Sequence, residues 1–283
     1  MPLSFSMRGQ GVVTRPGLWL RIGGVVGGTA LLAFSLLPFQ LAGLLLARFG
    51  RDGLALRVPL LFHRGVLALI GVRVEVRGCP VTDRRPVLFA GNHISWLDIP
   101  VIGSVLPVSF IAKSEVRDWP VFGLLARLQR TVFVERRAVR TRHHRDEMQR
   151  RLDGGGALVL FAEGTSGDGL RLLPYKSAFF SVAEPRGNGA VPVQPFTLEY
   201  TRIGGYPATR RHMPLVAWIG DMTLGAHILG VLANRPITAR LTFHEPVYWP
   251  QFSGRKELAG YCHACTGSAF RQPAAQADSL LDS

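Results

Sequence analysis

Hydrophobic and polar residues follow two periods along the chain, one typical of strands and one typical of helices. Alternating or unbroken apolar runs predict strands over residues 72–76, 86–90, 109–112, 131–134, 157–161, 190–198 and 237–243. Helical spacing predicts helices between them, over residues 60–70, 100–106, 120–128, 137–152, 177–183 and 224–233. Strands separated by helices of this length predict an α/β fold, with a mixed, largely parallel sheet covered by helices.

An uncharged segment at residues 22–47 precedes this pattern, and Gln40 is its only large polar side chain. A helix of this length would reach roughly 39 Å, more than the hydrocarbon core of a bilayer at about 30 Å. Pro38 is expected to kink or divide it. Arginines flank the segment on both sides, so charge does not fix an orientation. The pattern suits a membrane-associated helix, or a helical hairpin that enters one leaflet and returns; a buried core helix is the alternative.

The length of 283 residues suits one α/β domain with an appendage. With 47% hydrophobic and 18% charged residues, the chain is too apolar for disorder and unusually apolar for a purely soluble enzyme. We expect three parts: a membrane-associated segment at residues 1–52, the α/β domain at 53–250, and a C-terminal helix with a flexible tail at 251–283.

The balance of charge is strongly basic, with 33 Lys and Arg residues against 19 Asp and Glu residues and a formal net charge of +14. Such an excess favours a polyanionic partner, either nucleic acid or anionic lipid headgroups. Few aromatic residues lie among the arginine clusters, and the sequence has no helix-turn-helix, zinc-finger or RNA-binding signature. The charge therefore predicts a membrane surface as a partner and no nucleic acid.

Three cysteines are an odd and sparse set, which fits a reducing compartment rather than a disulfide framework. Cys262, His263 and Cys265 resemble the start of a zinc site, but tetrahedral zinc needs four ligands and no second pair follows at finger-like spacing. We therefore expect ordinary thiols on a late helix, and no metal.

His93 and Asp98 are the first candidates for catalysis. Side chains five positions apart on a regular helix point about 140° from each other. The two can meet only if His93 lies in the loop after a strand and Asp98 in the first turn of the next helix. Residues 95–98 resemble a capping box, with Ser95 as N-cap and Asp98 at the third helical position. An imidazole that a carboxylate orients can take a proton from a hydroxyl group at neutral pH; the alternative is a surface histidine beside a turn.

The nucleophile is expected to belong to the substrate. No serine lies in a Gly-x-Ser-x-Gly elbow, and no cysteine has a convincing base partner. A second motif follows the strand at 157–161: Glu163, Gly164 and Thr165 begin a glycine-rich turn whose backbone N–H groups suit an anion. Arg171 and Lys176 add positive charge just beyond it. An ordinary turn is the alternative.

Four blocks in order resemble the lysophospholipid acyltransferase family, which includes the 1-acylglycerol-3-phosphate acyltransferases. They are the His-x-x-x-x-Asp block at 93–98, Phe-Val-Glu-Arg at 133–136, Phe-Ala-Glu-Gly-Thr at 161–165 and Val-Pro-Val-Gln-Pro at 191–195. Leu-Pro-Tyr-Lys at 173–176 and Ala-Lys-Ser-Glu at 112–115 also match the family. The resemblance spans residues 59–247.

This resemblance implies a membrane-associated O-acyltransferase. A fatty acyl group would pass from an acyl-carrier-protein or coenzyme A thioester to a lysolipid hydroxyl, with no cofactor besides this co-substrate. His93 and Asp98 would be the catalytic pair. The substrate-binding residues would be Arg136, Glu163, Gly164, Thr165, Lys176 and Lys113, with Glu163 ordering the turn. The expected location is the inner (cytoplasmic) membrane, with the active site facing the cytoplasm.

Three departures from the family pattern bear on the turn and on the acceptor. Ala162 replaces the usual proline, which is expected to loosen the turn. Glu135 replaces a common aspartate, an exchange that we expect to be tolerated. The run 166–169, Ser-Gly-Asp-Gly, replaces a more basic sequence and resembles the bacterial lyso-ornithine-lipid acyltransferase branch. The expected acceptor is 1-acylglycerol-3-phosphate, followed by lyso-ornithine lipid; a non-catalytic, basic, lipid-binding membrane protein is the rival from another class.

Overall fold

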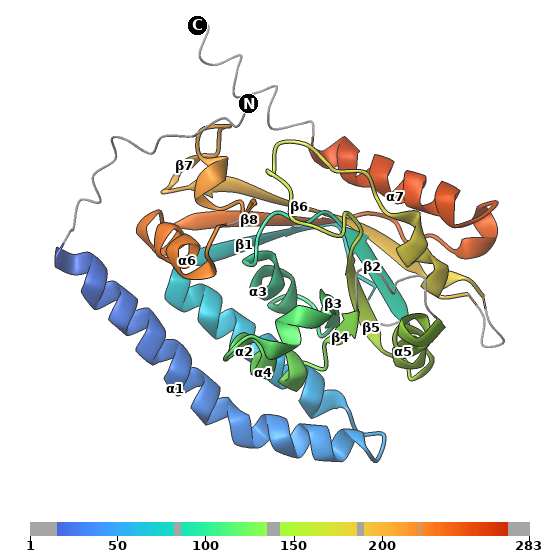
Figure 1. Cartoon of the computed structure of the whole chain (residues 1–283), viewed down its shortest axis with the longest axis horizontal. Helices are drawn as coiled ribbons and strands as arrows, with labels where there is room; N and C mark the ends of the chain where they lie inside the picture. Colours follow the sequence, from blue (N-terminus) through green and yellow to red (C-terminus); the bar gives the residue numbers. More distant parts are fainter. Residues whose placement is uncertain (1–15, 82–85, 135–141, 186–189, 221, 271–283) are drawn as a thin grey trace, which may run out of the picture.

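A mixed sheet forms the centre of the molecule. The computed structural model describes residues 16–81, 86–134, 142–185, 190–220 and 222–270. The eight strands are β1 (Val72–Arg77), β2 (Val87–Gly91), β3 (Ser109–Lys113), β4 (Val132–Val134), β5 (Ala157–Phe161), β6 (Val193–Ile203), β7 (Tyr206–Pro207) and β8 (Ile237–Phe243). They lie in the order β1-β8-β6-β2-β5-β3-β4, with β7 paired to β6 (Figure 1).

Most neighbouring strands are parallel. Among the described strands, the pairs β6–β8 and β6–β7 are antiparallel and the other pairs are parallel. Within the described residues the sheet is accompanied by the α-helices α1 (Pro16–Ala47), α2 (Gly53–Ile70), α3 (Asp98–Gly103), α4 (Phe122–Leu128), α5 (Arg142–Asp153), α6 (Leu224–Ala233) and α7 (Arg255–Phe270). The predicted fold class is confirmed. The segment expected as a helix at 177–183 is a 3₁₀-helix instead, and β6 extends beyond the predicted strand to Ile203.

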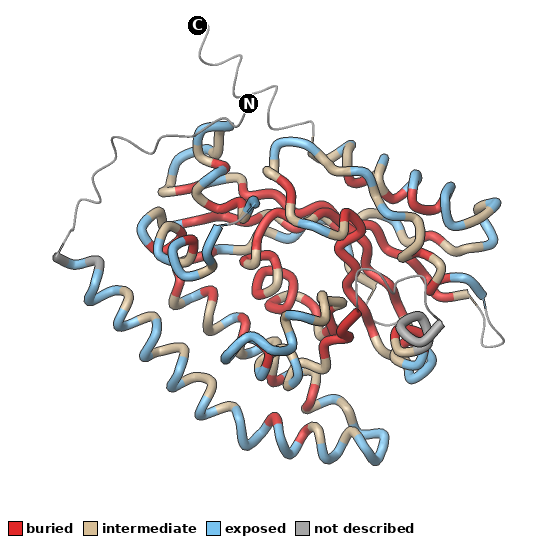
Figure 2. Tube along the Cα trace, viewed as in Figure 1, coloured by how far each residue is buried: buried red, intermediate tan, exposed pale blue. Residues whose placement is uncertain are grey.

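Each face of the sheet packs into its own hydrophobic core. Along β2, Val87 and Phe89 belong to a core shared with α2, α3 and α6, whereas Leu88 and Ala90 belong to a core shared with α5 and α7. Burial on both faces explains why the central strands read as unbroken apolar runs. The tube in Figure 2 shows these strands buried between the two helical layers.

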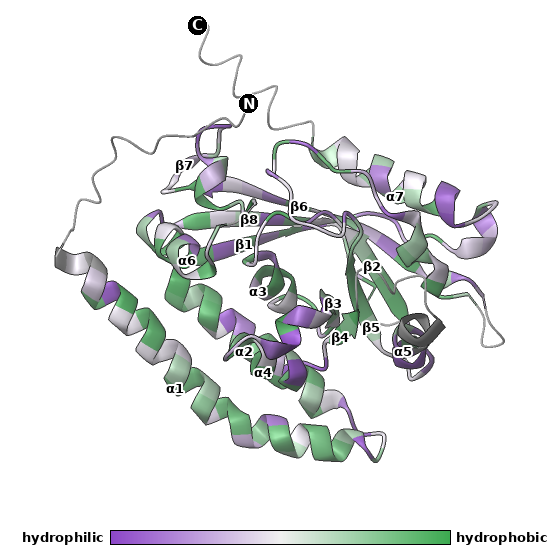
Figure 3. Ribbon diagram, viewed as in Figure 1, coloured by the Kyte–Doolittle hydropathy of each residue, from purple (hydrophilic) through white to green (hydrophobic). Residues whose placement is uncertain are grey.

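The N-terminal segment forms one arm of an antiparallel helical hairpin. The helix α1 runs unbroken through Pro38 and packs along α2. Figure 1 shows that α1 bends in its C-terminal half, so the expected kink is present but the expected division is not. The length and composition of Trp19–Ala47 and Gly53–Ile70 would allow each to cross a membrane. Only 11% of an 18-residue window within the first stretch is buried, and Figure 3 colours much of α1 as hydrophobic, so α1 is not a buried core helix.

Candidate active site

The candidate site lies where β2 and β5 end. Because the two strands are parallel, their carboxyl ends meet at one edge of the sheet, where open α/β sheets commonly bind ligands. The loop after β2 carries His93, and Asp98 is the first residue of α3. Their side chains meet as expected, with 2.7 Å between His93 Nδ1 and Asp98 Oδ2. Asp98 is fully buried, whereas 19% of the His93 side chain is accessible.

Four donors surround the Asp98 carboxylate. Its Oδ2 accepts hydrogen bonds from the backbone N–H groups of Ile94 (2.6 Å) and Ser95 (2.9 Å) in addition to the imidazole, and its Oδ1 accepts from the Tyr200 hydroxyl (2.6 Å). A carboxylate only accepts hydrogen bonds, so His93 Nδ1 carries the proton that lies between the two residues. The neutral imidazole then presents Nε2 as a proton acceptor.

The predicted capping box is only half formed. The helix begins at Asp98 rather than at Trp96, so Ser95 is not its N-cap. Asp98 still reaches back to the Ser95 N–H, but the Ser95 hydroxyl accepts from Leu97 N at 3.3 Å instead of from Asp98 N. The carboxylate is engaged by the loop and by His93, and this geometry replaces a regular first helical turn.

Glu163 connects three segments of the site. Its Oε2 accepts from His93 N at 3.2 Å and its Oε1 from Leu173 N at 3.0 Å. Only 3% of Glu163 is exposed, and burial raises the pKa of its carboxyl group to about 7. The two oxygens therefore connect the loop after β2 with the segment around Leu173. The preceding Phe161 stacks on the imidazole, with 4.0 Å between the ring centroids of Phe161 and His93.

Lys176 lies directly against the glycine-rich turn. Gly164 has a φ of +68°, and a β-carbon at this position would lie 2.8 Å from Lys176 Nζ. Glycine is therefore needed both for the backbone conformation and for the close approach of the ammonium group. Thr165 and Lys113 line the same cavity as Lys176, and Lys113 Nζ pairs with Glu115 at 2.5 Å. The expected residue Arg136, like Glu135, lies outside the described residues.

The end of the turn is close to electrically neutral. Asp168 lies 3.5 Å from Arg171 and also accepts hydrogen bonds from Leu170 N and Arg171 N. Ala162, expected to loosen the turn, donates its N–H to Gly91 O at 3.0 Å. A proline could not make that bond, so the substitution adds an anchor between the ends of β2 and β5.

His93 opens into a large and mostly apolar cavity. The cavity has a volume of about 1280 Å³, and its walls come mainly from α1, α2, α4 and β3. Two tryptophans line the cavity near His93. Trp96 follows His93 by three residues in the same loop, and Trp218 N donates a hydrogen bond to Ile94 O. Such a space can hold a long hydrocarbon chain beside the imidazole.

Two supporting contacts were not predicted. Tyr200 is separated from Asp98 by 102 positions, and the indole N–H of Trp96 donates to Nδ1 of the buried His227 at 2.8 Å. Nothing in the sequence around either partner indicates these long-range pairs: His227 lies in the predicted helix at 224–233, and Tyr200 lies two residues beyond the predicted strand at 190–198. Cys262 and Cys265 lie on α7, as expected for ordinary thiols. Within the described ranges, no three His, Cys, Asp or Glu side chains gather to hold a metal ion.

A carboxylate-oriented imidazole beside an apolar cavity can take a proton from a hydroxyl group next to a hydrocarbon chain. Comparison with known proteins agrees: the Acyltransferase family profile matches residues 73–199. The chain is 46% identical to the lyso-ornithine lipid O-acyltransferase of Brucella abortus, over 85% of this chain and 90% of that protein. It is 45% identical to the Rhizobium meliloti protein of the same name, over 71% and 70% of the two chains.

The fold is also similar to the crystal structure of the 1-acyl-sn-glycerophosphate acyltransferase PlsC from Thermotoga maritima. The TM-score is 0.58 and the identity 23%, over 89% of this chain and 97% of that one. The chain belongs to the lysophospholipid acyltransferase family and is an acyltransferase. The non-catalytic lipid-binding protein considered from the sequence is thereby set aside.

Proposed function

We propose that the chain transfers a fatty acyl group from an acyl-carrier-protein or coenzyme A thioester to the free hydroxyl of lyso-ornithine lipid. The observation that carries the acyl-transfer chemistry is the His93–Asp98 contact of 2.7 Å at the wall of a cavity of about 1280 Å³. The cavity would hold hydrocarbon, and the imidazole would reach the hydroxyl group.

In the proposed mechanism His93 acts as general base. Nε2 takes the hydroxyl proton as the oxygen attacks the thioester carbonyl, and Asp98 stabilises the resulting imidazolium. Collapse of the tetrahedral intermediate forms the ester and breaks the carbon–sulfur bond. The imidazolium returns its proton to the departing thiolate, so the enzyme ends in its starting state.

The acceptor is proposed from the relatives and from the charge of the turn. Proteins called lyso-ornithine lipid O-acyltransferase are 33–46% identical over 65–85% of this chain. An ornithine headgroup brings a carboxylate and an ammonium, whereas a phosphate monoester brings only negative charge. The turn carries Asp168 in the run 166–169, where a more basic sequence would suit a phosphate monoester better. The order of the two acceptors expected from sequence is therefore reversed.

The second candidate acceptor is 1-acyl-sn-glycerol-3-phosphate. A 1-acyl-sn-glycerol-3-phosphate acyltransferase of Neisseria meningitidis is 40% identical, over 44% of this chain and 49% of that protein. The Lys176 ammonium against Gly164 would suit a phosphate as well as a carboxylate. This candidate has the weaker support, because the similarity covers less of both chains.

Purified protein assayed with both lysolipids and both thioester donors tests the proposal. We expect kcat/KM to be at least tenfold higher with lyso-ornithine lipid than with 1-acyl-sn-glycerol-3-phosphate. The opposite ratio would favour the second acceptor. Failure with both lysolipids and both donors would contradict the proposed reaction.

Arg136 is proposed to bind the anionic group of the acceptor. Arg136→Ala should then raise the apparent KM for the acceptor far more than that for the donor, because a charge-assisted contact to the headgroup is lost. Arg140→Ala, at a nearby arginine outside the four sequence blocks, is the matched control. Equal losses with acceptor and donor would instead indicate a structural arginine.

We further propose that the hairpin of α1 and α2 attaches the enzyme to the inner (cytoplasmic) membrane, with the active site facing the cytoplasm. The lipid acceptor must be reached at headgroup depth, and α1 presents an apolar surface beside the cavity. Acyl-carrier-protein and coenzyme A thioesters are cytoplasmic, which supports the orientation. The division of the chain at residues 52 and 250 stays a prediction.

A further inference from the structure

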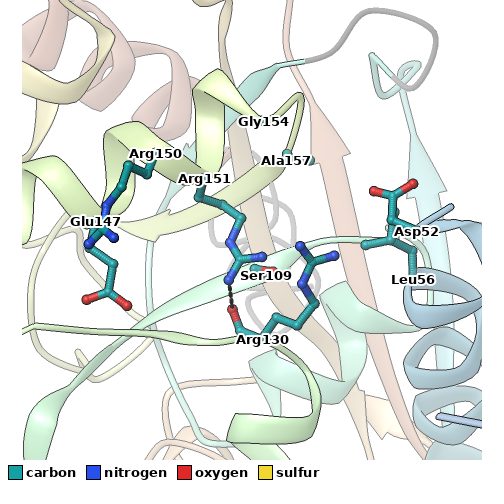
Figure 4. A pocket seen from close by; sticks show the side chains of 10 residues that line it. Asp52, Leu56, Ser109, Arg130, Glu147, Arg150, Arg151, Gly154 and Ala157 are labelled. Atoms are coloured by element: carbon teal, nitrogen blue, oxygen red, sulfur yellow. Dashed lines mark hydrogen bonds between the residues drawn. The ribbon is translucent and has the colours of Figure 1, made fainter. Parts of the chain in front are cut away.

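A second cavity lies at the opposite edge of the sheet from His93. It has a volume of about 260 Å³ and is formed where β3 and β5 begin, beside the C-terminal end of α5 and the first turn of α2. Figure 4 shows its side chains. The lining residues are Asp52, Leu56, Ser109, Arg130, Glu147, Arg150, Arg151, Gly154, Gly156 and Ala157. The lining contains none of the residues proposed for acyl transfer.

Three arginines and two carboxylates line this cavity, which leaves an excess of one positive charge. Arg151 donates a hydrogen bond from Nη2 to Arg130 O at 3.2 Å, drawn as a dashed line in Figure 4. Partial burial of Arg151 lowers the pKa of its guanidinium, and the like charge of Arg130 lowers that pKa further. Within the part of the chain that the structure describes, the Arg130 guanidinium has no hydrogen-bond or ion-pair partner. Two like charges thus line one small cavity.

The backbone of Arg130 is in a conformation that glycine usually occupies. Its φ is +62°, and it follows α4 at the position where a Schellman motif requires the left-handed conformation. Both bonds of that motif are present, from Arg130 N to Arg127 O and from Thr131 N to Ala126 O, each at 2.9 Å. Glycine would remove the strain, yet the chain has an arginine there whose side chain lines the cavity. Strain of this kind is often retained at functional sites.

The cavity adjoins the turn that joins the two arms of the apolar hairpin. Asp52 and Leu56 belong to the start of the α2 arm. On the other side of the turn, Leu45 and Phe49 are exposed, and so are Arg48 and Arg51. An apolar surface that ends in cationic side chains is typical of elements that lie at the level of lipid headgroups.

We propose that Arg130 and Arg151 form a binding site for the phosphate of an anionic membrane lipid, separate from the acyl-transfer site. The phosphate would lie between the two guanidinium groups, which can each offer paired N–H donors to its oxygens. The hydrocarbon chains of the same lipid would lie along the exposed face of α1. The site would thus hold the hairpin at a fixed depth; this last step rests on the proposed membrane attachment.

The test compares two double variants with the same loss of charge in the full-length chain. Arg130→Asn with Arg151→Gln removes the site, and asparagine tolerates the left-handed backbone. Arg210→Gln with Arg211→Gln, two exposed arginines elsewhere, is the control. Binding is measured by flotation with phosphatidylcholine vesicles that contain one-fifth phosphatidylglycerol, and with vesicles of phosphatidylcholine alone. Acyl transfer to detergent-dispersed acceptor shows that each variant is folded.

We expect the site variant to lose at least tenfold in affinity for phosphatidylglycerol vesicles, and the control variant less than threefold. Equal losses would overturn the proposal in favour of diffuse attraction. A separate arm measures Tm of the protein in detergent with millimolar inorganic phosphate, against chloride at equal ionic strength. If phosphate raises Tm for wild type but not for the site variant while vesicle binding is unchanged, the site takes soluble phosphate and the lipid assignment is wrong. If the proposed acyl-transfer function is wrong, the wild-type chain will show no activity in the acyl-transfer assay, whereas its flotation with vesicles will be unaffected.

Discussion

At the scale of single residues, the chemistry depends on one imidazole and the carboxylate that orients it. His93→Ala should lower turnover by roughly a thousandfold or more, because the proposed base is removed. Asp98→Asn should also lower turnover by orders of magnitude, because an amide in place of the carboxylate disturbs the arrangement of the four donors around it. Turnover with saturating donor and acceptor is the measurement, and flotation with vesicles controls for folding. More than a tenth of wild-type turnover in His93→Ala would contradict the general-base role.

Tyr200 contacts the same pair through Asp98, on the carboxylate oxygen that does not bind His93. Tyr200→Phe removes the hydrogen bond of 2.6 Å to Asp98 Oδ1 and leaves that buried oxygen without this donor. A net loss of about 1.5 kcal/mol is the lower limit of the range for a hydrogen bond to a charged group and corresponds to roughly tenfold. We expect kcat to fall by about that factor with KM for the donor little changed. Thr201→Val, at the neighbouring position on β6, is the control. An unchanged kcat in Tyr200→Phe would show that three donors are sufficient.

The contact between His93 and Asp98 could be predicted because the two residues are close in sequence. His93 and Asp98 lie within one strand–loop–helix unit, so spacing alone limits how they can meet. Tyr200 could not be predicted in the same way, because its contact depends on the pairing of β6 with β2. The helix start was misplaced for a related reason: the carboxylate of Asp98 is engaged by His93 and Tyr200 as well as by the loop, and this contact competes with a regular capping box.

At the scale of elements, α1 both encloses the cavity and presents an apolar surface. Thr29, Leu37 and Gln40 line the cavity, whereas Leu31, Leu41 and Leu45 are more than half exposed and do not line it. Removing the whole helix would therefore damage both the cavity wall and the exposed apolar surface. Leu31→Gln, Leu41→Gln and Leu45→Gln in one chain change the exposed surface alone, and glutamine preserves the helix.

We expect this triple variant to lose at least tenfold in activity on acceptor in vesicles and less than twofold on detergent-dispersed acceptor. Its remaining vesicle binding should fall with added salt, because electrostatic attraction is then the main contribution. Val76→Gln with Tyr206→Gln, at two exposed apolar positions outside the hairpin, is the control. Full activity of the triple variant on vesicles would show that α1 is not the membrane anchor.

Elements with a strong pattern were predicted and elements without one were not. The buried strands β2 and β5 have apolar runs that only a covered parallel sheet explains, and their predicted positions agree closely with the structure. The uncharged segment indicated α1 and the helical spacing at 60–70 indicated most of α2, but nothing in the sequence indicated that the two helices pair. The helix α2 also contains Arg57, His63 and Arg64. These polar groups are accommodated by specific contacts, such as Arg64 Nε to Ser104 O at 2.8 Å and His63 to Gln129 at 3.0 Å. Such contacts become visible only once the tertiary packing is known.

At the scale of the whole molecule, stability is coupled to pH through the buried Glu163. Its pKa in the folded chain is about 7, above the ordinary value of 4.5, because burial disfavours the carboxylate. The folded state therefore binds the proton more tightly than the unfolded state does. The resulting stabilisation is complete below pH 4.5 and is lost as pH rises through 7. At roughly 1.4 kcal/mol for each pH unit, the loss amounts to about 3 kcal/mol.

Glu163→Gln removes the titrating group, so the variant should lack this part of the pH dependence. An amide in place of the carboxyl group also cannot accept both backbone N–H bonds through oxygen, so the variant should be less stable than wild type at pH 5. We expect the difference in unfolding free energy between wild type and variant to shrink as pH rises from 5 to 8. Urea unfolding in a fixed detergent measures it, with Asp118→Asn, at an exposed carboxylate, as the control. A difference that stays constant or grows with pH would mean that Glu163 is already ionised at pH 5, and that its two backbone hydrogen bonds outweigh the cost of its burial.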